Sequence, residues 1–229
     1  MLRIIVMTAA FAIAITGIAN AQLSIVDTLS GTFIDISGSG TPLGLGDDGE
    51  VDIPTTVGNS VFAAGTARVG NNGGVRFAGP GQGLGFTNQP IPSSANFGLT
   101  SQVLDVFWDD IDSDTGNVYW QEIGGTLIVQ WHDRPFFPNT PDHITAQLQV
   151  HSSGPAFAQF LYRDVEGARP GGGVSATIGY QDGGAGFNDV EWSFNTGGSV
   201  GNGTVLSVVP EPGTLVLLGL GGLALIRRR

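Results

Sequence analysis

Apolar and polar residues alternate with a period of two through the middle of this chain, a pattern typical of β-strands. Residues 117–123 and 126–132 are rich in β-branched and aromatic side chains, and Gly124-Gly125 separates the two runs. Glycine adopts the positive φ angles of a two-residue hairpin turn at little cost, so the pattern predicts a β-hairpin. With the turn at these glycines, Trp120 lies opposite Val129.

A second hairpin is predicted from 143–151 and 156–163, which are joined by the turn residues Ser152-Ser153-Gly154-Pro155. In the first run apolar residues alternate with threonine and glutamine, so one face of the hairpin must be buried. Shorter apolar runs between glycine-rich and asparagine-rich turns predict further strands at 51–55, 66–69, 75–77, 103–108, 174–180, 190–194 and 204–208.

These strands predict the fold class of the whole chain. No helical period of 3.6 and no fixed-length repeat is found between the two ends. Many short strands at regular spacing favour an all-β antiparallel sandwich or jelly roll, and we expect one such domain over 47–208. Residues 22–46 are rich in Ser, Thr and Gly, which is consistent with either an edge strand or an N-terminal arm.

The N-terminal end predicts export. Arg3 precedes a mostly apolar stretch over 4–18, and Ala19-Asn20-Ala21 matches the small-residue pattern of a cleavage site. This arrangement is typical of a secretory signal peptide, here 1–21, that a signal peptidase removes after Ala21. The alternative is an N-terminal helix that stays in the membrane.

The C-terminal end, 209–229, has a different composition. Pro210-Glu211-Pro212 comes first, then an uncharged apolar segment at 215–226, and then three arginines at 227–229. A helix of 12 residues covers about 18 Å, which is less than the roughly 30 Å of a bilayer core. We therefore expect a short hydrophobic helix that contacts the membrane during sorting, with the arginines on the cytoplasmic side. A permanent anchor is the alternative.

The charge balance narrows the classes of partner. Against 20 acidic residues the chain has 9 basic ones, a net charge of −11. An acidic surface repels phosphate backbones, which argues against nucleic acid as a partner and favours divalent cations. The chain has no cysteine, which excludes disulfides, thiol catalysis and cysteine-based zinc sites.

The densest acidic segment is 109–116, which predicts a possible calcium site. Asp110, Asp112 and Asp114 alternate as ligands do at positions 1, 3 and 5 of a calcium loop. The glycine and the acidic residue that should follow at positions 6 and 12 each come one residue late, and no flanking helices are predicted. A stretched calcium loop and a solvated turn between two strands both remain open.

No catalytic motif stands out. His132, Asp133, Asp142 and His143 lie close in sequence, which suggests acid–base or metal chemistry, but positions at strand ends favour an ordinary surface role. The segment 44–49 matches G-x-G-x-x-G formally, yet its two aspartates would repel a pyrophosphate and no helix is predicted after it. We expect no enzyme activity and no cofactor other than the possible calcium ion.

The central strands resemble the nidogen-like extracellular β module of bacterial surface proteins. The resemblance covers about 45–180. It is carried, in this order, by 45–51, 68–77, 106–112, 116–120, 127–131, 156–162 and 175–180. It implies a β-rich, non-catalytic extracellular or matrix role, and it implies no defined ligand.

The tail resembles the PEP-CTERM sorting signal, through Pro210, Glu211, Pro212, the short apolar segment and the terminal arginines. This resemblance implies recognition by an exosortase, an integral-membrane processing enzyme. Proline residues hold the motif extended and incompatible with a helix, which suits a segment that an enzyme binds.

Together these patterns predict an exported structural or interaction protein. It would be tethered at the inner membrane before processing, then released to the cell surface or the extracellular matrix. The alternative is a module that binds exopolysaccharide with the help of calcium, and a secreted hydrolase is the third hypothesis. Calcium titration separates the first two, and an activity screen tests the third.

Overall fold

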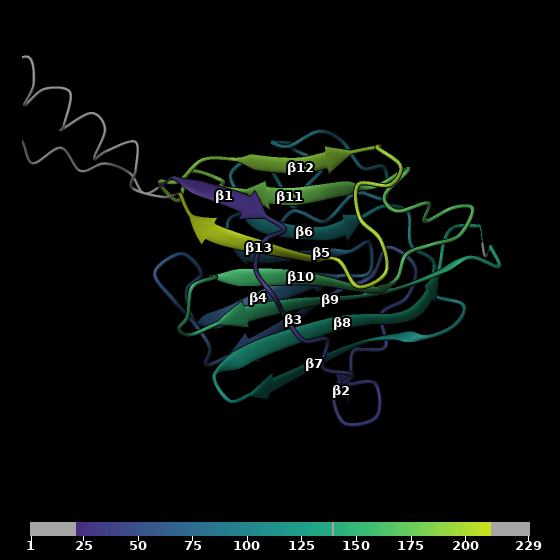
Figure 1. Cartoon of the computed structure of the whole chain (residues 1–229), viewed down its shortest axis with the longest axis horizontal. Helices are drawn as coiled ribbons and strands as arrows, with labels where there is room; N and C mark the ends of the chain where they lie inside the picture. Colours follow the sequence, from purple (N-terminus) through teal and green to yellow (C-terminus); the bar gives the residue numbers. More distant parts are fainter. Residues whose placement is uncertain (1–21, 139, 212–229) are drawn as a thin grey trace, which may run out of the picture.

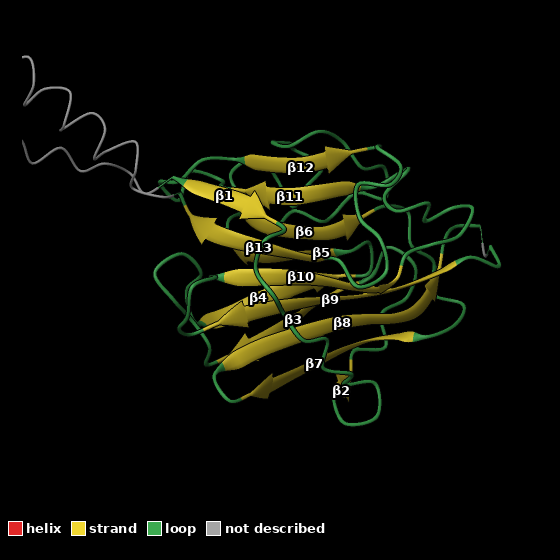
Figure 2. Cartoon of the chain, in the orientation of Figure 1, coloured by secondary structure: helices red, strands yellow, loops and turns green. Residues whose placement is uncertain are grey.

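The computed structural model describes residues 22–138 and 140–211. Over these residues the chain forms thirteen strands and no helix (Figure 2). All strand pairs are antiparallel, and they form two sheets of seven and six strands. The prediction of an all-β antiparallel sandwich is confirmed.

The two sheets form the two layers of Figure 1. The seven-stranded sheet has the order β1 (Leu23–Val26), β13 (Val205–Pro210), β10 (Ala158–Asp164), β9 (His143–His151), β8 (Thr126–Pro135), β7 (Asn117–Ile123) and β2 (Thr41–Pro42). The six-stranded sheet has the order β12 (Val190–Phe194), β11 (Thr177–Gln181), β6 (Gln102–Trp108), β5 (Gly74–Ala78), β4 (Gly65–Gly70) and β3 (Glu50–Thr55).

Both predicted hairpins are present. Gly124 and Gly125 have φ angles of 56° and 80°, as a tight two-residue turn requires. In the β7–β8 hairpin Trp120 pairs with Val129, which confirms the predicted register. The second hairpin, β9–β10, turns within the predicted segment.

The core lies between the sheets, and two buried aromatic side chains form hydrogen bonds from one sheet to the other. The Tyr162 hydroxyl donates to the carbonyl of Val106 at 2.7 Å, and the Trp131 ring N–H donates to the carbonyl of Gly70 at 3.1 Å. Each bond joins the two sheets, and each places a large apolar ring in the core while satisfying its polar atom. Both side chains are almost fully buried.

Two predicted strands differ from the structure by three residues at one end. The strand predicted at 174–180 begins only at Thr177, because 170–176 form a succession of hydrogen-bonded turns. The strand predicted at 126–132 continues to Pro135. Its register shifts between Trp131 and Arg134, where Asp133 has a φ angle of 53°. A bulge of this kind bends a strand without ending it.

Residues 22–46 contain both of the expected structures. β1 is an edge strand, and the following segment crosses the outer face of the seven-stranded sheet as an arm (Figure 1). Four glutamines of the sheet hold this arm through bonds to the backbone of 30–36. They are Gln130, Gln147, Gln149 and Gln159. The polar face of the second predicted hairpin is therefore covered by the arm.

The predicted signal peptide with Ala19 and Ala21, and the tail from Pro212 onward with its segment 215–226, lie outside the described residues. Within 22–138 and 140–211, no helix is present that is long and apolar enough to cross a membrane.

Candidate functional site: the sorting junction and the acidic cluster

The sorting motif begins inside the folded domain. Pro210 is the last residue of β13 and pairs with Leu23 of β1. The next residue, Glu211, donates its backbone N–H to the carbonyl of Gln22 at 2.8 Å. Gln22 is the first residue after the predicted signal cleavage site, so the two predicted processing points meet at one end of the sandwich (Figure 1).

A side chain from the loop between β11 and β12 holds this junction in place. The Asn188 side-chain oxygen accepts from the Leu23 N–H at 2.6 Å, and the Asn188 amide donates to the Leu23 carbonyl at 2.9 Å. Leu23 itself is 1% exposed and belongs to the core. Immediately after the predicted cleavage site, the chain is therefore held by β13 on one side and by Asn188 on the other. Nothing in the sequence pattern around Asn188 indicated this role, because the contact spans 165 positions.

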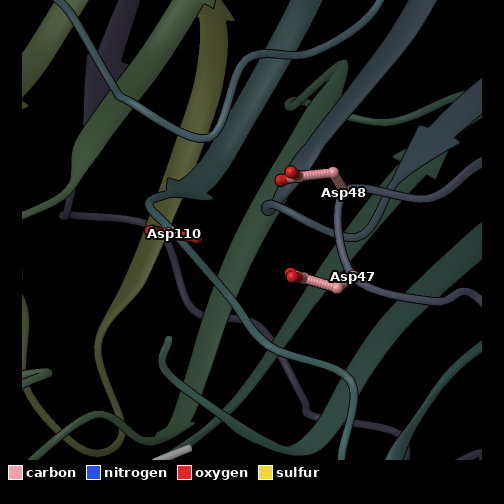
Figure 3. A group of neighbouring side chains, drawn as sticks. All are labelled: Asp47, Asp48 and Asp110. Carbon is pink, nitrogen blue, oxygen red and sulfur yellow. The ribbon is translucent and has the colours of Figure 1, made fainter. Parts of the chain in front are cut away.

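Three carboxylates from distant parts of the sequence form an acidic cluster. Asp47 and Asp48 lie in the loop before β3, and Asp110 follows β6. One oxygen from each lies within 4.8 Å of the other two. Figure 3 shows Asp47 and Asp48 side by side, with their carboxylates directed toward the segment that carries Asp110.

The electrostatics of this cluster favour a cation. Burial, together with the charges of Asp48 and Asp47, raises the pKa of Asp110 to about 6. Burial and the charges of neighbouring aspartates, Asp48 first, also raise the pKa of Asp47. A raised pKa means that the ionised cluster is unfavourable by itself, and a bound cation relieves this repulsion.

The surroundings of the cluster combine apolar and acidic groups. The exposed side chains of Phe86 and Phe137 line the same shallow hollow as the three aspartates. Asp47 and Asp48 also belong to the G-x-G-x-x-G match at 44–49, which no helix follows. The residues that argued against a phosphate site there thus contribute to a potential cation site.

The predicted calcium loop is only partly assembled. Among the described residues, the acidic set with oxygens close enough to share an ion contains Asp110 but neither Asp112 nor Asp114. Asp112 is buried, and its nearest effect is on the buried Arg134: burial lowers the pKa of Arg134, and the charge of Asp112 partly opposes this shift. Asp114 is exposed in the turn before β7. The candidate calcium ligands are therefore Asp110, Asp47 and Asp48 instead of Asp110, Asp112 and Asp114.

The histidines and aspartates around β8 and β9 do not converge on one site. His143 and Asp133 form an exposed pair with 2.7 Å between Nδ1 and Oδ1. Asp142 instead accepts from the backbone N–H of Arg169 at 3.0 Å. The half-buried His132 packs edge-on against Tyr119, with 6.2 Å between ring centroids.

Comparisons with known proteins give two matches. The model of a family described as NIDO related matches residues 25–216, which is most of the chain. The model of the PEP-CTERM protein-sorting motif matches residues 208–229. No curated protein and no solved structure matches the chain.

Proposed function

The chain belongs to the NIDO-related family, and from this premise we propose that its sandwich is a non-catalytic module of the cell surface or extracellular matrix. Its PEP-CTERM motif makes it an exported protein that is directed to an exosortase while associated with the membrane. In this proposal the enzyme processes the chain at Pro210, Glu211 and Pro212. The sandwich then passes to its final location outside the cell.

The observation that carries the proposal is the position where the fold ends. β13 runs without interruption to Pro210, and Glu211 still bonds to Gln22. Within the described residues, every strand of the sandwich therefore ends at or before Pro210, the first residue of the motif. A tail of this kind suits an address that is removed after export, because a cut after Glu211 removes none of the described strands.

Alanine substitution of the motif tests the proposal. A variant with Pro210→Ala, Glu211→Ala and Pro212→Ala should accumulate as a longer, membrane-held form, whereas the wild-type protein should be exported in a shorter form. Asp164→Ala, an exposed acidic residue at the end of β10, serves as the control and should be processed normally. Export of the triple variant at the same size and rate as the wild type would rule out motif-directed processing.

The geometry of the acidic cluster favours a second function, calcium binding by Asp47, Asp48 and Asp110. Calcium takes oxygen ligands at about 2.3–2.6 Å, so two ligands on opposite sides of one ion lie up to about 5 Å apart. The spacing within 4.8 Å fits this requirement. Bound calcium would hold the loop before β3 against the segment after β6. It would also supply a positive charge beside the exposed aromatic rings of the hollow.

Calcium titration tests this second function. Addition of millimolar calcium to chelator-treated protein should raise the melting temperature, by mass action on the folded state. Asp47→Asn should abolish the rise, and Asp164→Asn should preserve it. An equal rise in wild type and Asp47→Asn would place the ion elsewhere.

A further inference from the structure

A second cleft, remote in sequence from the acidic cluster, has the chemistry of a sugar site. It has a volume of about 560 Å³, which is within the usual range for small-molecule sites. It opens between the end of β1, the loop after β10 and the loop between β12 and β13. The side chains that define it are Asp27, Glu166, Trp192 and Thr204, and most of the remaining lining residues are glycines.

The walls of this cleft are held together by backbone contacts. Gly172 accepts at its carbonyl from the N–H of Val200 at 3.2 Å and from the hydroxyl of Ser199 at 3.0 Å. The N–H of Gly198 donates to Gly171 at 3.0 Å. A Cβ at Gly172 would lie 2.3 Å from the Val200 carbonyl oxygen, so only glycine permits this approach. The cleft is thus formed before any ligand arrives.

Trp192 supplies the apolar surface of the cleft. Its ring N–H donates to the carbonyl of Ser199 at 3.1 Å, which fixes the ring relative to the wall. The ring is partly buried against the core and also lines the cleft. A fixed indole ring offers a flat apolar surface at little entropic cost, since the side chain is already ordered.

Two carboxylates supply the polar surface. The side chain of Glu166 accepts a hydrogen bond from the backbone N–H of Asn202 at 3.3 Å, which positions it at the rim. Asp27 is exposed, and within the described residues no group donates to its carboxylate. Ionised carboxylates accept strong hydrogen bonds, and two of them select a ligand that brings several donors.

The combination excludes several classes of ligand. The cleft has no arginine, lysine or histidine in its lining, so phosphates, sulfates and uronic acids would meet only repulsion. A neutral sugar meets both surfaces, because its C–H face packs on an aromatic ring while its hydroxyls donate to carboxylates. An adjoining hollow of about 380 Å³ shares Asp27 and Thr204, which gives room for a neighbouring sugar unit.

We propose that the cleft lined by Trp192, Asp27 and Glu166 binds a neutral saccharide chain. The binding is independent of calcium, because none of the three residues belongs to the acidic cluster. It also goes beyond the proposed sorting function and does not depend on it, since the cleft is complete within the described sandwich. A matrix module with such a cleft attaches to uncharged extracellular glycan.

The test is titration of the purified exported protein, in the presence of EDTA, with neutral oligosaccharides of glucose, galactose or mannose. At least one series should quench or shift the tryptophan fluorescence with saturation in the millimolar range or below. Gly201→Leu should weaken this binding at least tenfold. Gly201 has no positive φ angle, and a Cβ there meets no atom closer than 3.7 Å, so the larger side chain fills the cleft without a clash at its base.

Two further variants provide a control for the leucine substitution and a test of the carboxylate contact. Gly81→Leu, at an exposed glycine with open space around it, is the matched control and should bind as the wild type does. Asp27→Ala should weaken binding about fivefold to tenfold without changing the melting temperature. The proposal is overturned if no neutral oligosaccharide binds, or if Gly201→Leu binds as well as Gly81→Leu. It is also overturned if tetramethylammonium or a polyamine saturates the cleft while sugars do not. Normal processing of the tail in all these variants separates this outcome from a failure of the sorting function.

Discussion

Glu211 of the sorting motif and Gln22 of the predicted mature N-terminus are bonded to each other, with 2.8 Å between the Glu211 nitrogen and the Gln22 oxygen. This bond closes the β1–β13 pair at the end of the sandwich where both termini of the domain lie (Figure 1). Two domain ends that lie together suit a chain attached to the membrane at both ends. This arrangement agrees with the predicted signal peptide and with the PEP-CTERM motif.

The first prediction concerns the hydrogen bonds of Asn188 to the backbone of Leu23 at this junction. Asn188→Ala should lower the free energy of unfolding by about 1–3 kcal/mol, because it leaves two backbone groups of the buried Leu23 without partners. Hydrogen exchange should show faster exchange of the β1 amides, with β7 and β8 unchanged.

The control for this prediction is Asn88→Ala. Among the described residues, the side chain of Asn88 bonds to the side chains of Thr177 and Asn195 and to no group of β1, so its loss should leave the exchange of β1 unaltered. If Asn188→Ala leaves β1 as protected as in the wild type, the junction is not held by Asn188.

The second prediction concerns the arm across the seven-stranded sheet. Gln147 is fully buried and bonds to both the N–H and the carbonyl of Ile34. Gln147→Ala should cost roughly 2–3 kcal/mol of stability, because it removes partners from buried polar groups. Limited proteolysis should then cut the variant within 30–36, a segment at which the wild type should resist cleavage. Equal resistance of the two proteins would show that the arm does not depend on this glutamine.

The third prediction is a pH dependence that originates in the core. Asp105 is fully buried, and this burial raises its pKa to about 8, partly opposed by a hydrogen bond from Asn96. The folded state then binds a proton more tightly than the unfolded state, whose ordinary pKa is near 3.8. Stability is therefore greatest at low pH and falls as the pH rises toward 8, by up to about 1.4 kcal/mol per pH unit.

Thermal unfolding at several pH values measures this effect. Between pH 5 and pH 8 stability should fall by up to about 4 kcal/mol, so the wild-type melting temperature should fall by up to roughly 8–16 °C, at roughly 2–4 °C per kcal/mol for a domain of this size. Asp105→Asn should remove most of the slope, because the amide cannot ionise. A slope that is unchanged in this variant would mean that other groups cause the pH dependence.

The fourth prediction concerns the acidic cluster without calcium. Because burial and the charges of Asp48 and Asp47 disfavour the ionised form of Asp110 and raise its pKa to about 6, stability should decrease between about pH 4 and pH 6 as Asp110 ionises. Asp110→Asn should raise the melting temperature at pH 7 by roughly 1–2 °C, since solvent screens most of this repulsion. If Asp110→Asn melts at a lower temperature than the wild type in the presence of chelator, ionised Asp110 does not destabilise the cluster. In saturating calcium the wild type should have the higher melting temperature of the two proteins.

The predicted and observed structures agree where local patterns determine the strands. The β7–β8 pair follows from its alternation and from Gly124-Gly125, because turn geometry fixes the register of a hairpin. β1 and β2 were not predicted as separate strands, because they are short edge strands whose partners lie far away in the sequence. Such pairs depend on the packing of the whole sandwich.

The candidate sites show the same limit. Asp110 was identified from its own segment, but Asp47 and Asp48 join it only because the loop before β3 folds against the end of β6. The spacing of Asp112 and Asp114 suggested ligands, yet in the structure the charge of Asp112 acts on the buried Arg134 instead. The cleft around Trp192 combines residues from 27 to 204, so no local motif encodes it. The sorting motif, in contrast, is contiguous and was identified from its residues alone.

The intact mass of the protein recovered outside the cell tests motif-directed processing most directly. We expect a chain that begins at Gln22 and ends within or shortly after Pro210-Glu211-Pro212, without the apolar segment and the terminal arginines. An exported protein whose mass includes Arg229 would contradict it.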